Sequence, residues 1–558
     1  MSRERGNKMK EEKILNIKFI ITAIICICLF SIAIIPKGLQ NDTFYTIKLG
    51  KLILENGIDM QEHFAWHEGL PYTYPHWLYD VIIYLIYSIS GFNGMYISTI
   101  VFTAILGMVL YLTNAKLTKN TVIPFFMTIL VLYIGKDYFT ARAQLLTFIL
   151  FILTIYYIER FLETKKKRYA IGLLIIPTII ANIHSAVFPF YFVLYLPYIG
   201  EWLLRFLIDK SDIITKILLK SDELEIKKLN KKSELNEKQK EKLELLIKRV
   251  ETNRKRLEEK NKTANEPYKI IVKPSENFKW LILIMLIAVF TGLITPIGDT
   301  PYTYLLHTMQ GNTTGNISEH LPIVLYESKY VLGYMFVAIC LISFTKIKIK
   351  LSDLFLLGGL MFLTLMSRRQ ASMMYFVGTF VIIKIICQII DMYDKDGTKE
   401  ILKYLTSIVG RIIIYSIFII FMISSLKDSK DDKIVSEKTY PIEATKYVKE
   451  NLDLNEIKLF NEYNFGSYLL FEDVPVFIDS RADVYDPQFN NWEDDIFRDF
   501  INITSPCNDY EEKLEHYGIT HLLIYKNSSF DKVLRLDTNY KELYSDDNFI
   551  IYERISAN

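Results

Sequence analysis

Cysteine is scarce in this chain, and the few cysteines are not grouped. There are five among 558 residues, and one of them, Cys507, stands alone in the polar C-terminal part. The other four lie in apolar runs: Cys26, Cys28, Cys340 and Cys387. No Cys-x-x-Cys pair occurs, so the sequence indicates neither a zinc site nor a disulfide framework.

A strong net charge is also missing. The chain has 65 basic and 63 acidic residues, a formal net charge of +2, so nucleic acid is not a favoured partner. Apolar residues make up 51% of the chain and the mean hydropathy is +0.19, although 23% of the residues are charged. Polar and apolar residues must therefore be segregated, as in a membrane protein whose helices satisfy their own backbone hydrogen bonds in lipid.

Apolar runs of spanning length occur about eleven times. They lie near 17–36, 94–113, 121–136, 143–162, 169–184, 186–207, 279–297, 329–346, 352–367, 370–390 and 404–426. A shorter apolar stretch, 77–90, begins in a polar loop and predicts a re-entrant or interfacial helix. The first run follows five basic residues and lacks a small-residue cleavage site, so we interpret it as a retained helix. The pattern predicts a mainly α, polytopic transmembrane helix bundle.

Lysine and arginine are distributed unevenly between these runs, and the positive-inside rule converts their distribution into a topology. With the N-terminus in the cytoplasm, every strongly basic loop falls on the cytoplasmic side: 116–119, 165–168, 209–278, 346–350 and 395–403. Residues 37–93 and 298–328 then lie outside. We expect a multi-pass protein of the plasma (cytoplasmic) membrane, with a transmembrane domain over 1–426 and an extracytoplasmic domain over 427–558.

Two parts of the chain differ from the membrane runs. The insert 209–278 has 19 basic and 14 acidic residues and leucines at helical spacing. It predicts a cytoplasmic helical hairpin or short coiled coil, or more simply a solvated spacer near lipid headgroups. The C-terminal part alternates helical and strand-like segments, which predicts a small α/β domain with a partly parallel sheet. Its strands are expected at 457–460, 474–478, 520–525 and 548–552.

Acidic residues near the outer membrane face are the first candidates for chemistry. Asp42 follows the first span in the sequence Asn-Asp-Thr-Phe-Tyr, and Glu319 and His320 precede a later span. A carboxylate at such a position is poorly solvated and is suited to act as a base or to bind a divalent cation. The simpler interpretations are that Asp42 caps the helix that follows it, and that Glu319 lies in an ordinary polar loop.

Three arginines form a cationic group on the same outer side. Arg142 precedes one span, and Arg368 and Arg369 lie between two apolar runs. Positive charge is rare on this side, and a guanidinium matches phosphate oxygens bidentately. The three arginines are therefore candidates to bind the phosphate of a lipid substrate. Headgroup contacts or internal salt bridges are the alternative.

Three short motifs carry a resemblance to a known family. They are Asn-Asp-Thr-Phe-Tyr at 41–45, Ser-Glu-His-Leu-Pro at 318–322 and Glu-Tyr-Asn-Phe-Gly at 462–466. In this order they resemble the catalytic acid of the first external loop, the fifth-loop motif and the Trp-Trp-Asp-Tyr-Gly signature of oligosaccharyltransferase catalytic subunits. Those proteins are members of the polytopic glycosyltransferase C (GT-C) superfamily. The resemblance implies a polyprenyl-phosphate-linked sugar donor and an external soluble domain.

The chain also departs from those enzymes. Asn464 stands in place of the signature acid, and Thr140-Ala141-Arg142 stands where those enzymes carry an acidic metal-ligand motif. A broad group of bacterial membrane proteins assigned to the same superfamily is more similar. The features shared with that group are Arg-Ala-Gln at 142–144, Asn-x-Gly-x-Tyr-Leu at 464–469 and Phe-Ile-Asp-x-Arg-Ala-Asp-x-Tyr at 477–485.

The last of these motifs offers two interpretations. Asp479 and Asp483 are suited to bind sugar hydroxyls or a cation, and Arg481 to bind phosphate. Alternatively, the three residues form a salt-bridge network that docks the C-terminal part onto the membrane part, because a short Asp-x-Arg-x-Asp run needs no ligand to be satisfied.

The leading hypothesis is a cell-envelope glycosyltransferase that moves a sugar from a polyprenyl-phosphate-linked donor to an extracytoplasmic glycan, lipid or protein. Asp42 would be the general base and Glu319 would assist it, with Mg²⁺ or Mn²⁺ as a candidate cofactor. The substrate-binding candidates are Arg142, Arg368, Arg369, His320, Asp479 and Arg481. Two alternatives come from other classes: a transporter or lipid flippase, and a non-catalytic assembly or scaffold protein.

Overall fold

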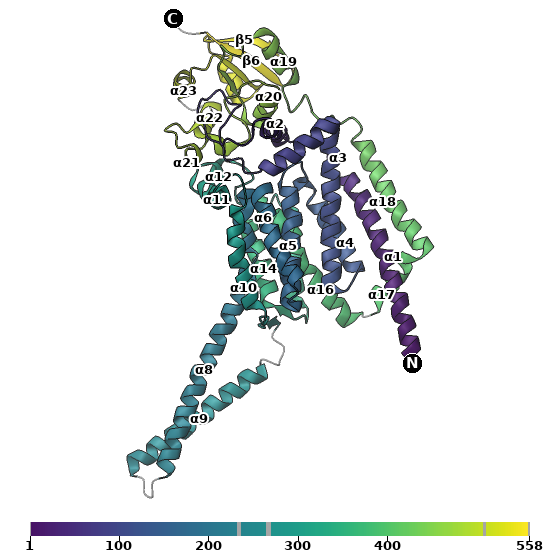
Figure 1. Cartoon of the computed structure of the whole chain (residues 1–558), viewed down its shortest axis with the longest axis vertical. Helices are drawn as coiled ribbons and strands as arrows, with labels where there is room; N and C mark the ends of the chain where they lie inside the picture. The colour runs from purple at the N-terminus through teal and green to yellow at the C-terminus, as the bar shows by residue number, and fades with distance from the viewer. Residues whose placement is uncertain (1, 232–235, 264–268, 395, 506–508, 556–558) are drawn as a thin grey trace.

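The computed structural model describes residues 2–231, 236–263, 269–394, 396–505 and 509–555, so Cys507 lies outside the described residues. Helices dominate, and the long ones run side by side in a bundle (Figure 1). A small α/β domain covers one end of the bundle, and a helical hairpin projects from the other end, where the N-terminus also lies (Figure 1). The mainly α, polytopic fold with a C-terminal α/β domain is therefore confirmed.

Among the described residues, five helical segments are long and apolar enough to cross a membrane. They are Glu12–Ile34, Trp77–Thr118, Gln144–Thr164, Ser185–Asn230 and Ile408–Asp428. A sixth is added if Arg368–Phe376 and Thr379–Tyr393, which meet at a bend of 40°, are taken as one broken span. Four expected spans are shorter apolar helices of 10–17 residues: Val122–Ile134, Phe278–Leu293, Lys329–Phe344 and Leu351–Met366. Two of these runs, 121–136 and 279–297, extend beyond their α-helices into 3-10 segments, Lys136–Tyr138 and Phe290–Leu293.

The expected interfacial helix is the first part of α3 (Trp77–Thr118), which bends at Gly91. Gly91 has φ 57° and ψ −150°, a conformation that side chains with a Cβ rarely adopt. The first part of α3 crosses the end of the bundle obliquely, and the second part runs along it (Figure 1).

Helix α2 (Asn41–Asn56) packs closely on this oblique part of α3. The contact is made at Gly50, where an added Cβ would lie 2.1 Å from the backbone oxygen of Asp80. The close approach fixes α2, and with it Asp42, against the end of the bundle.

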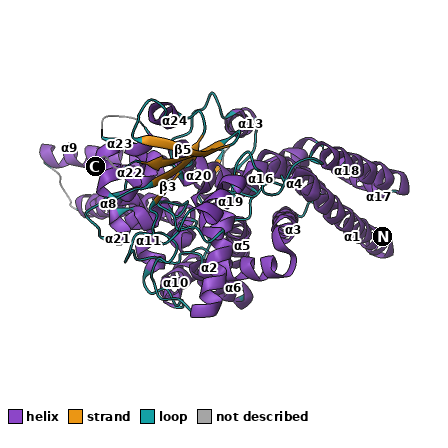
Figure 2. Ribbon diagram, turned by 90° about the horizontal axis from the view of Figure 1, so that it is seen from above, coloured by secondary structure: helices purple, strands orange, loops and turns teal. Residues whose placement is uncertain are grey.

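The α/β domain has a four-stranded sheet in the order β3-β4-β6-β5. The strands are Leu459–Asn461 (β3), His521–Tyr525 (β4), Tyr540–Ser545 (β5) and Phe549–Arg554 (β6). β3 and β4 are parallel and the other pairs are antiparallel, which agrees with the expected partly parallel sheet. The helices around the sheet are α19 (Ile442–Asn451), α20 (Tyr463–Phe471), α22 (Ile496–Thr504), α23 (Tyr510–His516) and α24 (Ser529–Leu534). Seen from above, the sheet lies over the bundle, whereas α1 (Ser2–Ile34) and α18 (Ile408–Asp428) extend to one side (Figure 2).

One expected strand, 474–478, is wrong. Its backbone pairs with the first loop, between α1 and α3, instead: Val476 donates its N–H to Phe64 and accepts at its carbonyl from Trp66, both at 3.2 Å. The side chain of Asn461 accepts from the N–H of Phe477. These hydrogen bonds satisfy the backbone groups of the segment, so it does not need a neighbouring strand in the sheet.

The first loop and the C-terminal domain share one hydrophobic core. Phe44, Tyr72 and Tyr74 from the loop region are buried in the same cluster as Phe460 and Phe477 from the domain. Sequence segments about 400 residues apart therefore form a single folding unit at this end of the molecule.

At the opposite end, the lower part of α8 (Leu196–Asn230) pairs with α9 (Glu237–Thr263) in a hairpin (Figure 1). Ion pairs join the two helices, including Arg254–Glu223 and Lys242–Glu225, both at 2.6 Å. The chain after the hairpin returns to the bundle through β1 (Ile270–Ile271), which pairs with β2 (Ile349–Lys350). The insert and the basic loop at 346–350 thus lie at the same end.

Candidate functional site

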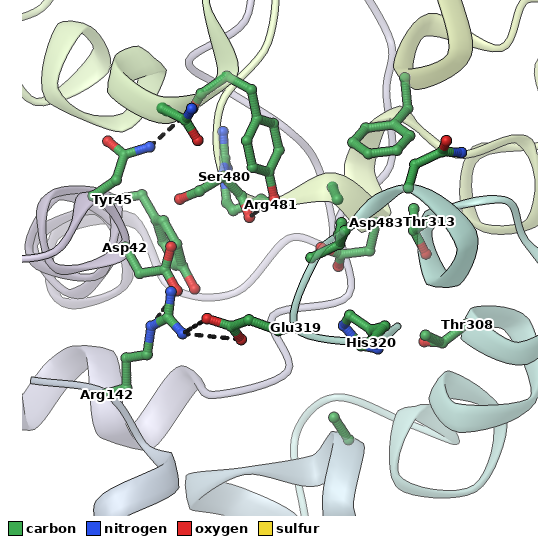
Figure 3. Close-up of a pocket in the computed structure, with 18 of the residues that line it drawn as sticks. Asp42, Tyr45, Arg142, Thr308, Thr313, Glu319, His320, Ser480, Arg481 and Asp483 are labelled. Carbon is green, nitrogen blue, oxygen red and sulfur yellow. Dashed lines mark hydrogen bonds and ion pairs between the residues drawn. The ribbon is translucent and has the colours of Figure 1, made fainter. Parts of the chain in front are cut away.

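A cavity of about 590 Å³ lies between the bundle and the α/β domain. Several parts of the chain line it, among them the start of α2, the turn before α5 (Gln144–Thr164), α11 (Thr300–Gln310) with the loop between it and α13 (Lys329–Phe344), and the C-terminal domain. Its lining is mostly polar and aromatic, with tyrosine, histidine, asparagine and serine side chains. Figure 3 shows this cavity.

One guanidinium joins the two expected acids. The Nε of Arg142 lies 2.7 Å from Oδ2 of Asp42, and its Nη1 donates to Oε1 of Glu319 at 3.1 Å (Figure 3). Nη1 also lies 3.4 Å from the second oxygen of Glu319. The two carboxylates, which are 277 positions apart in the sequence, thus face the same cation at the edge of the cavity.

Asp42 reaches this position from the first turn of α2. The helix begins at Asn41, the residue before it is the extended Gln40, and no side chain caps it. The interpretation of Asp42 as the N-cap is therefore wrong. A carboxylate in the first turn still interacts favourably with the helix dipole, and here its side chain points to Arg142.

Glu319 and His320 lie in the loop before α13, and the 3-10 segment η4 (Arg368–Gln370) holds that loop by its backbone. The N–H of Arg369 donates to the carbonyl of Glu319, and the N–H of Arg368 donates to that of Leu321, both at 3.0 Å. This pairing places the two arginines beside the acid. Burial raises the pKa of Glu319, but the charges of Arg142 and Arg369 outweigh burial, and the net shift is downward. Burial lowers the pKa of His320, and Arg369 lowers it further.

The arginines differ in what they line. Arg369 lines the main cavity, together with Arg142, Glu319 and His320. Arg368 and Arg369 both line a smaller adjoining cavity of about 230 Å³, which also contains Arg142 and Glu319. Within the described residues the side chain of Arg369 forms no salt bridge, so its charge is available to a ligand.

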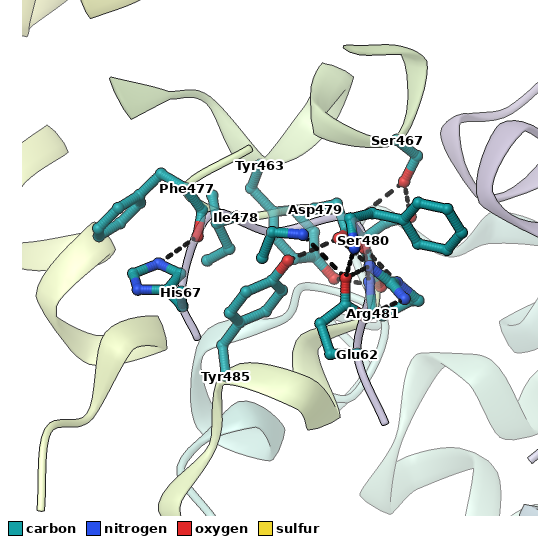
Figure 4. Close-up of polar contacts among 12 residues, drawn as sticks. Glu62, His67, Tyr463, Ser467, Phe477, Ile478, Asp479, Ser480, Arg481 and Tyr485 are labelled. Atoms are coloured by element: carbon teal, nitrogen blue, oxygen red, sulfur yellow. Dashed lines mark hydrogen bonds and ion pairs between the residues drawn. The ribbon is translucent and has the colours of Figure 1, made fainter. Parts of the chain in front are cut away.

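Arg481 has a different environment from the other arginines, because its side chain is only 1% exposed. Its Nη2 donates to Glu62 at 3.0 Å and to Asp479 at 2.6 Å, and its Nε donates to Asp479 at 2.9 Å (Figure 4). Tyr485 donates a further hydrogen bond to Asp479 at 2.6 Å. Of the two interpretations, the structure has the ion-pair network, with Glu62 of the first loop in place of Asp483.

Two cavity-lining carboxyls of the C-terminal domain are poorly solvated. Burial raises the pKa of Asp483 to about 7, against the opposing charge of Arg481. Burial also raises the pKa of Glu462 to about 7. Each can therefore gain or lose a proton near neutral pH, and each faces the cavity from the side opposite the bundle.

Sequence reasoning missed several cavity residues, among them Tyr72, His76 and Tyr304. Burial lowers the pKa of His76 to about 3, so this histidine faces the cavity as a neutral ring. The sequence marks these residues only by their position between two apolar runs. Many ordinary loop residues have the same position.

A divalent cation does not fit the acids as they stand. Among the described residues, no three side chains of histidine, cysteine, aspartate or glutamate are grouped to hold a metal ion. The two acids that do converge have the guanidinium of Arg142 between them. Their present partner is therefore a cation that belongs to the chain.

Comparison with known proteins identifies a shared fold. No family model matches the sequence, and no curated protein is significantly similar to it. The apo crystal structure of the Archaeoglobus fulgidus oligosaccharyltransferase has a TM-score of 0.51 and 10% sequence identity, covering 91% of this chain and 69% of that one. The same protein tethered through a disulfide bond to an acceptor peptide with an NVT sequon has a TM-score of 0.48 and 11% identity, covering 96% and 74%. The apo structure confirms at the level of the fold the resemblance that the sequence motifs indicated.

Proposed function

We propose that this membrane protein is a glycosyltransferase that moves a sugar from a polyprenyl-phosphate-linked donor to an extracytoplasmic acceptor. Its fold is that of an oligosaccharyltransferase, which supports glycosyl transfer in general. The observation that carries the proposal is the convergence of Asp42 and Glu319 on Arg142 at the edge of a polar cavity, with Arg369 beside them.

In this proposal Asp42 is the general base. It accepts the proton of the acceptor hydroxyl or amide while the acceptor atom bonds to the anomeric carbon of the sugar. The bond from that carbon to the phosphate oxygen breaks, and its electron pair leaves with the lipid phosphate. Arg369 and Arg368 stabilise the charge that develops on this phosphate. Glu319 and Arg142 hold Asp42 in the orientation that the transfer requires.

The two carboxyls on the domain side would bind the acceptor. Asp483 and Glu462 line the same cavity, and each has a pKa near neutrality. A protonated carboxyl both donates and accepts hydrogen bonds, which suits it to a ligand with several hydroxyl groups.

We place the cavity and the C-terminal domain (427–558) on the extracytoplasmic side, and the insert 209–278 in the cytoplasm. The basic loops favour this orientation, because the insert and the loop at 346–350 lie at the end of the bundle opposite the cavity (Figure 1). The donor would then be used on the outer face, within the transmembrane domain 1–426.

The test is a transfer assay with the full-length protein in lipid vesicles. The donor is a polyprenyl phosphate carrying a radiolabelled sugar, and a cell-envelope extract supplies the acceptor. We expect Asp42→Asn to lower turnover by about 100-fold or more, since general-base catalysis contributes roughly 10²–10⁴-fold. Donor binding should remain. Glu55→Gln is the matched control, because Glu55 lies at the exposed end of the same helix.

A second pair of variants tests the phosphate site. Arg369→Ala should weaken donor binding, whereas Arg498→Ala, which removes an exposed arginine of the C-terminal domain, should not. Normal turnover in Asp42→Asn, or movement of the labelled lipid across the vesicle membrane without transfer, would reject the proposal in favour of a transporter or flippase.

A further inference from the structure

The positive charge between the two acids of the site is supplied by a side chain of the protein itself. Arg142 lies between Asp42 and Glu319, with nitrogen–oxygen distances of 2.7 Å and 3.1 Å. Its side chain is 25% exposed, and its two acidic partners are 20% and 46% exposed. The contact of Nη1 with Glu319 is a hydrogen bond, whereas the contact of Nε with Asp42 is a close ion pair in which the Nε–H has no hydrogen-bond acceptor among the described residues.

A bridging divalent ion would need the space that Arg142 fills. Mg²⁺ binds oxygen ligands at about 2.0–2.1 Å in a nearly octahedral arrangement. Both carboxylates would have to close on one centre at that distance, whereas each now faces a different nitrogen of the guanidinium. The described residues also supply no third acid, histidine or cysteine to complete such a site.

The charges nearby argue in the same direction. Arg369 adds a second positive charge beside Glu319, and it acts on the pKa values of both Glu319 and His320. Two acids therefore already have two basic side chains around them. A divalent ion at this place would meet electrostatic repulsion from both arginines.

We propose that Arg142 is the permanent cation of this site, in the position that a divalent metal would otherwise occupy, and that the protein works without a metal. Its role in turnover rests on the proposed function: it positions the Asp42 carboxylate and balances the charge of the acid pair. It is a positioning residue, because it acts through the two acids. The statement about metal binding concerns the folded protein alone and can be tested without any substrate.

Arginine is suited to this role in a way that lysine is not. The planar guanidinium spreads its charge over three nitrogens, so one side chain can face two carboxylates from different segments, through a hydrogen bond from Nη1 to Glu319 and an ion pair between Nε and Asp42. A lysine ammonium is a point charge on a flexible stem. Arg142→Lys should therefore keep the charge but lose the fixed orientation of Asp42, which predicts a lower kcat with little change in the KM for the donor.

The experiment titrates Mn²⁺ into the purified full-length protein in lipid nanodiscs and follows free Mn²⁺ by electron paramagnetic resonance. We expect the wild type to bind no Mn²⁺ at this site up to 1 mM, on the order of the weakest extracellular divalent-ion sites. Arg142→Asp removes the resident cation and adds a third carboxylate, so it should gain one Mn²⁺ site at least 10-fold tighter than that limit. That new site should disappear in the double variant Arg142→Asp/Asp42→Asn. Arg498→Asp, an acid added on the exposed domain surface, is the matched control and should gain no such site.

Arg142→Ala provides a second route if the aspartate variant does not fold. It leaves the two acids facing each other without their cation, and it should bind Mn²⁺ more tightly than the wild type. One Mn²⁺ per wild-type chain that is lost in Asp42→Asn would overturn the inference and leave the transferase proposal standing. Loss of wild-type transfer on treatment with EDTA would also overturn it. Absence of transfer in every preparation would instead reject the proposed function, and the Mn²⁺ titration would still decide the metal question.

Discussion

The buried network around Arg481 gives the sharpest stability prediction. Arg481→Met keeps most of the side-chain volume but removes the cation that serves Glu62 and Asp479, neither of which has an exposed side chain. Removing one partner of a buried ion pair costs about 3–5 kcal/mol, and here two carboxylates lose their partner at once. We therefore expect a loss of about 5 kcal/mol in the free energy of unfolding of the C-terminal unit.

Two further variants test this reasoning. Glu62→Gln leaves the Arg481–Asp479 pair intact and weakens only the contacts to one acid, so it should cost about 1.5–3 kcal/mol. Replacing all three residues with neutral side chains (Glu62→Gln, Asp479→Asn, Arg481→Met) should recover much of the loss, because no unpaired charge remains buried. The matched control is Lys541→Met, which breaks the exposed Lys541–Glu553 pair of the same domain and should cost about 1 kcal/mol or less.

The assay is chemical unfolding of the detergent-solubilised protein. Limited proteolysis is then carried out, and cleavage between the membrane part and residue 440 is measured. Loss of the network should expose the docked loop to the protease. If Arg481→Met unfolds at the same denaturant concentration as Lys541→Met, the network does not hold the domain and the argument from buried charge is refuted.

Four other predictions follow from the same structure. Burial raises the pKa of Asp483 from 3.8 to about 7, so between these pH values the folded protein keeps a proton that the unfolded chain has lost. The free energy of unfolding should therefore fall as the pH rises from about 4 to 7. Asp483→Asn should be more stable than the wild type at pH 8 but not at pH 4. Gly50→Val should lower the melting temperature sharply, since its Cβ would lie 2.1 Å from a facing carbonyl oxygen, whereas Gly358→Ala has open space and should not. Deletion of 215–265 should leave transfer activity and the melting temperature of the bundle largely unchanged, and an unfolded or inactive product would show that the insert is required. A reporter that is active only in an oxidising compartment should work when fused to the C-terminus, and a silent fusion there would invert the proposed topology.

Much of the fold was predictable, because hydropathy and charge act locally. Apolar runs locate the helices, and a polar segment with alternating patterns locates the α/β domain. Segment 474–478 shows the limit of that reasoning. Its apolar side chains are buried as a strand would require, but its backbone partners are Phe64 and Trp66, about 410 positions earlier. Local pattern does not reveal which distant segment will satisfy a backbone.

The candidate site was predictable in some of its members, but not in Tyr72, His76 and Tyr304 and not in the pairing of its charges. Asp42, Glu319 and Arg142 stand in motifs beside spans, so sequence indicated the face on which they would lie. That one guanidinium would hold both acids depends on the packing of α2 against α3, which is fixed by the absence of a side chain at Gly50. The Glu62–Arg481 pair joins residues 419 positions apart, and no local signal marks it.

The shared core of the first loop and the C-terminal domain has a consequence for biogenesis. During synthesis the loop with Phe44 and Tyr72 leaves the ribosome hundreds of residues before Phe460 and Phe477, its partners in the core. Until the end of translation Phe44 is only partly covered, by Phe92 of α3, because its other ring contacts, with Tyr440, Tyr468 and Phe471, are made later. The cavity is then the last part of the molecule to form, when the domain closes over the loop. A nascent chain stalled before residue 459 would be inserted in the membrane without a closed cavity, and chaperones and quality-control proteases would recognise its exposed loop.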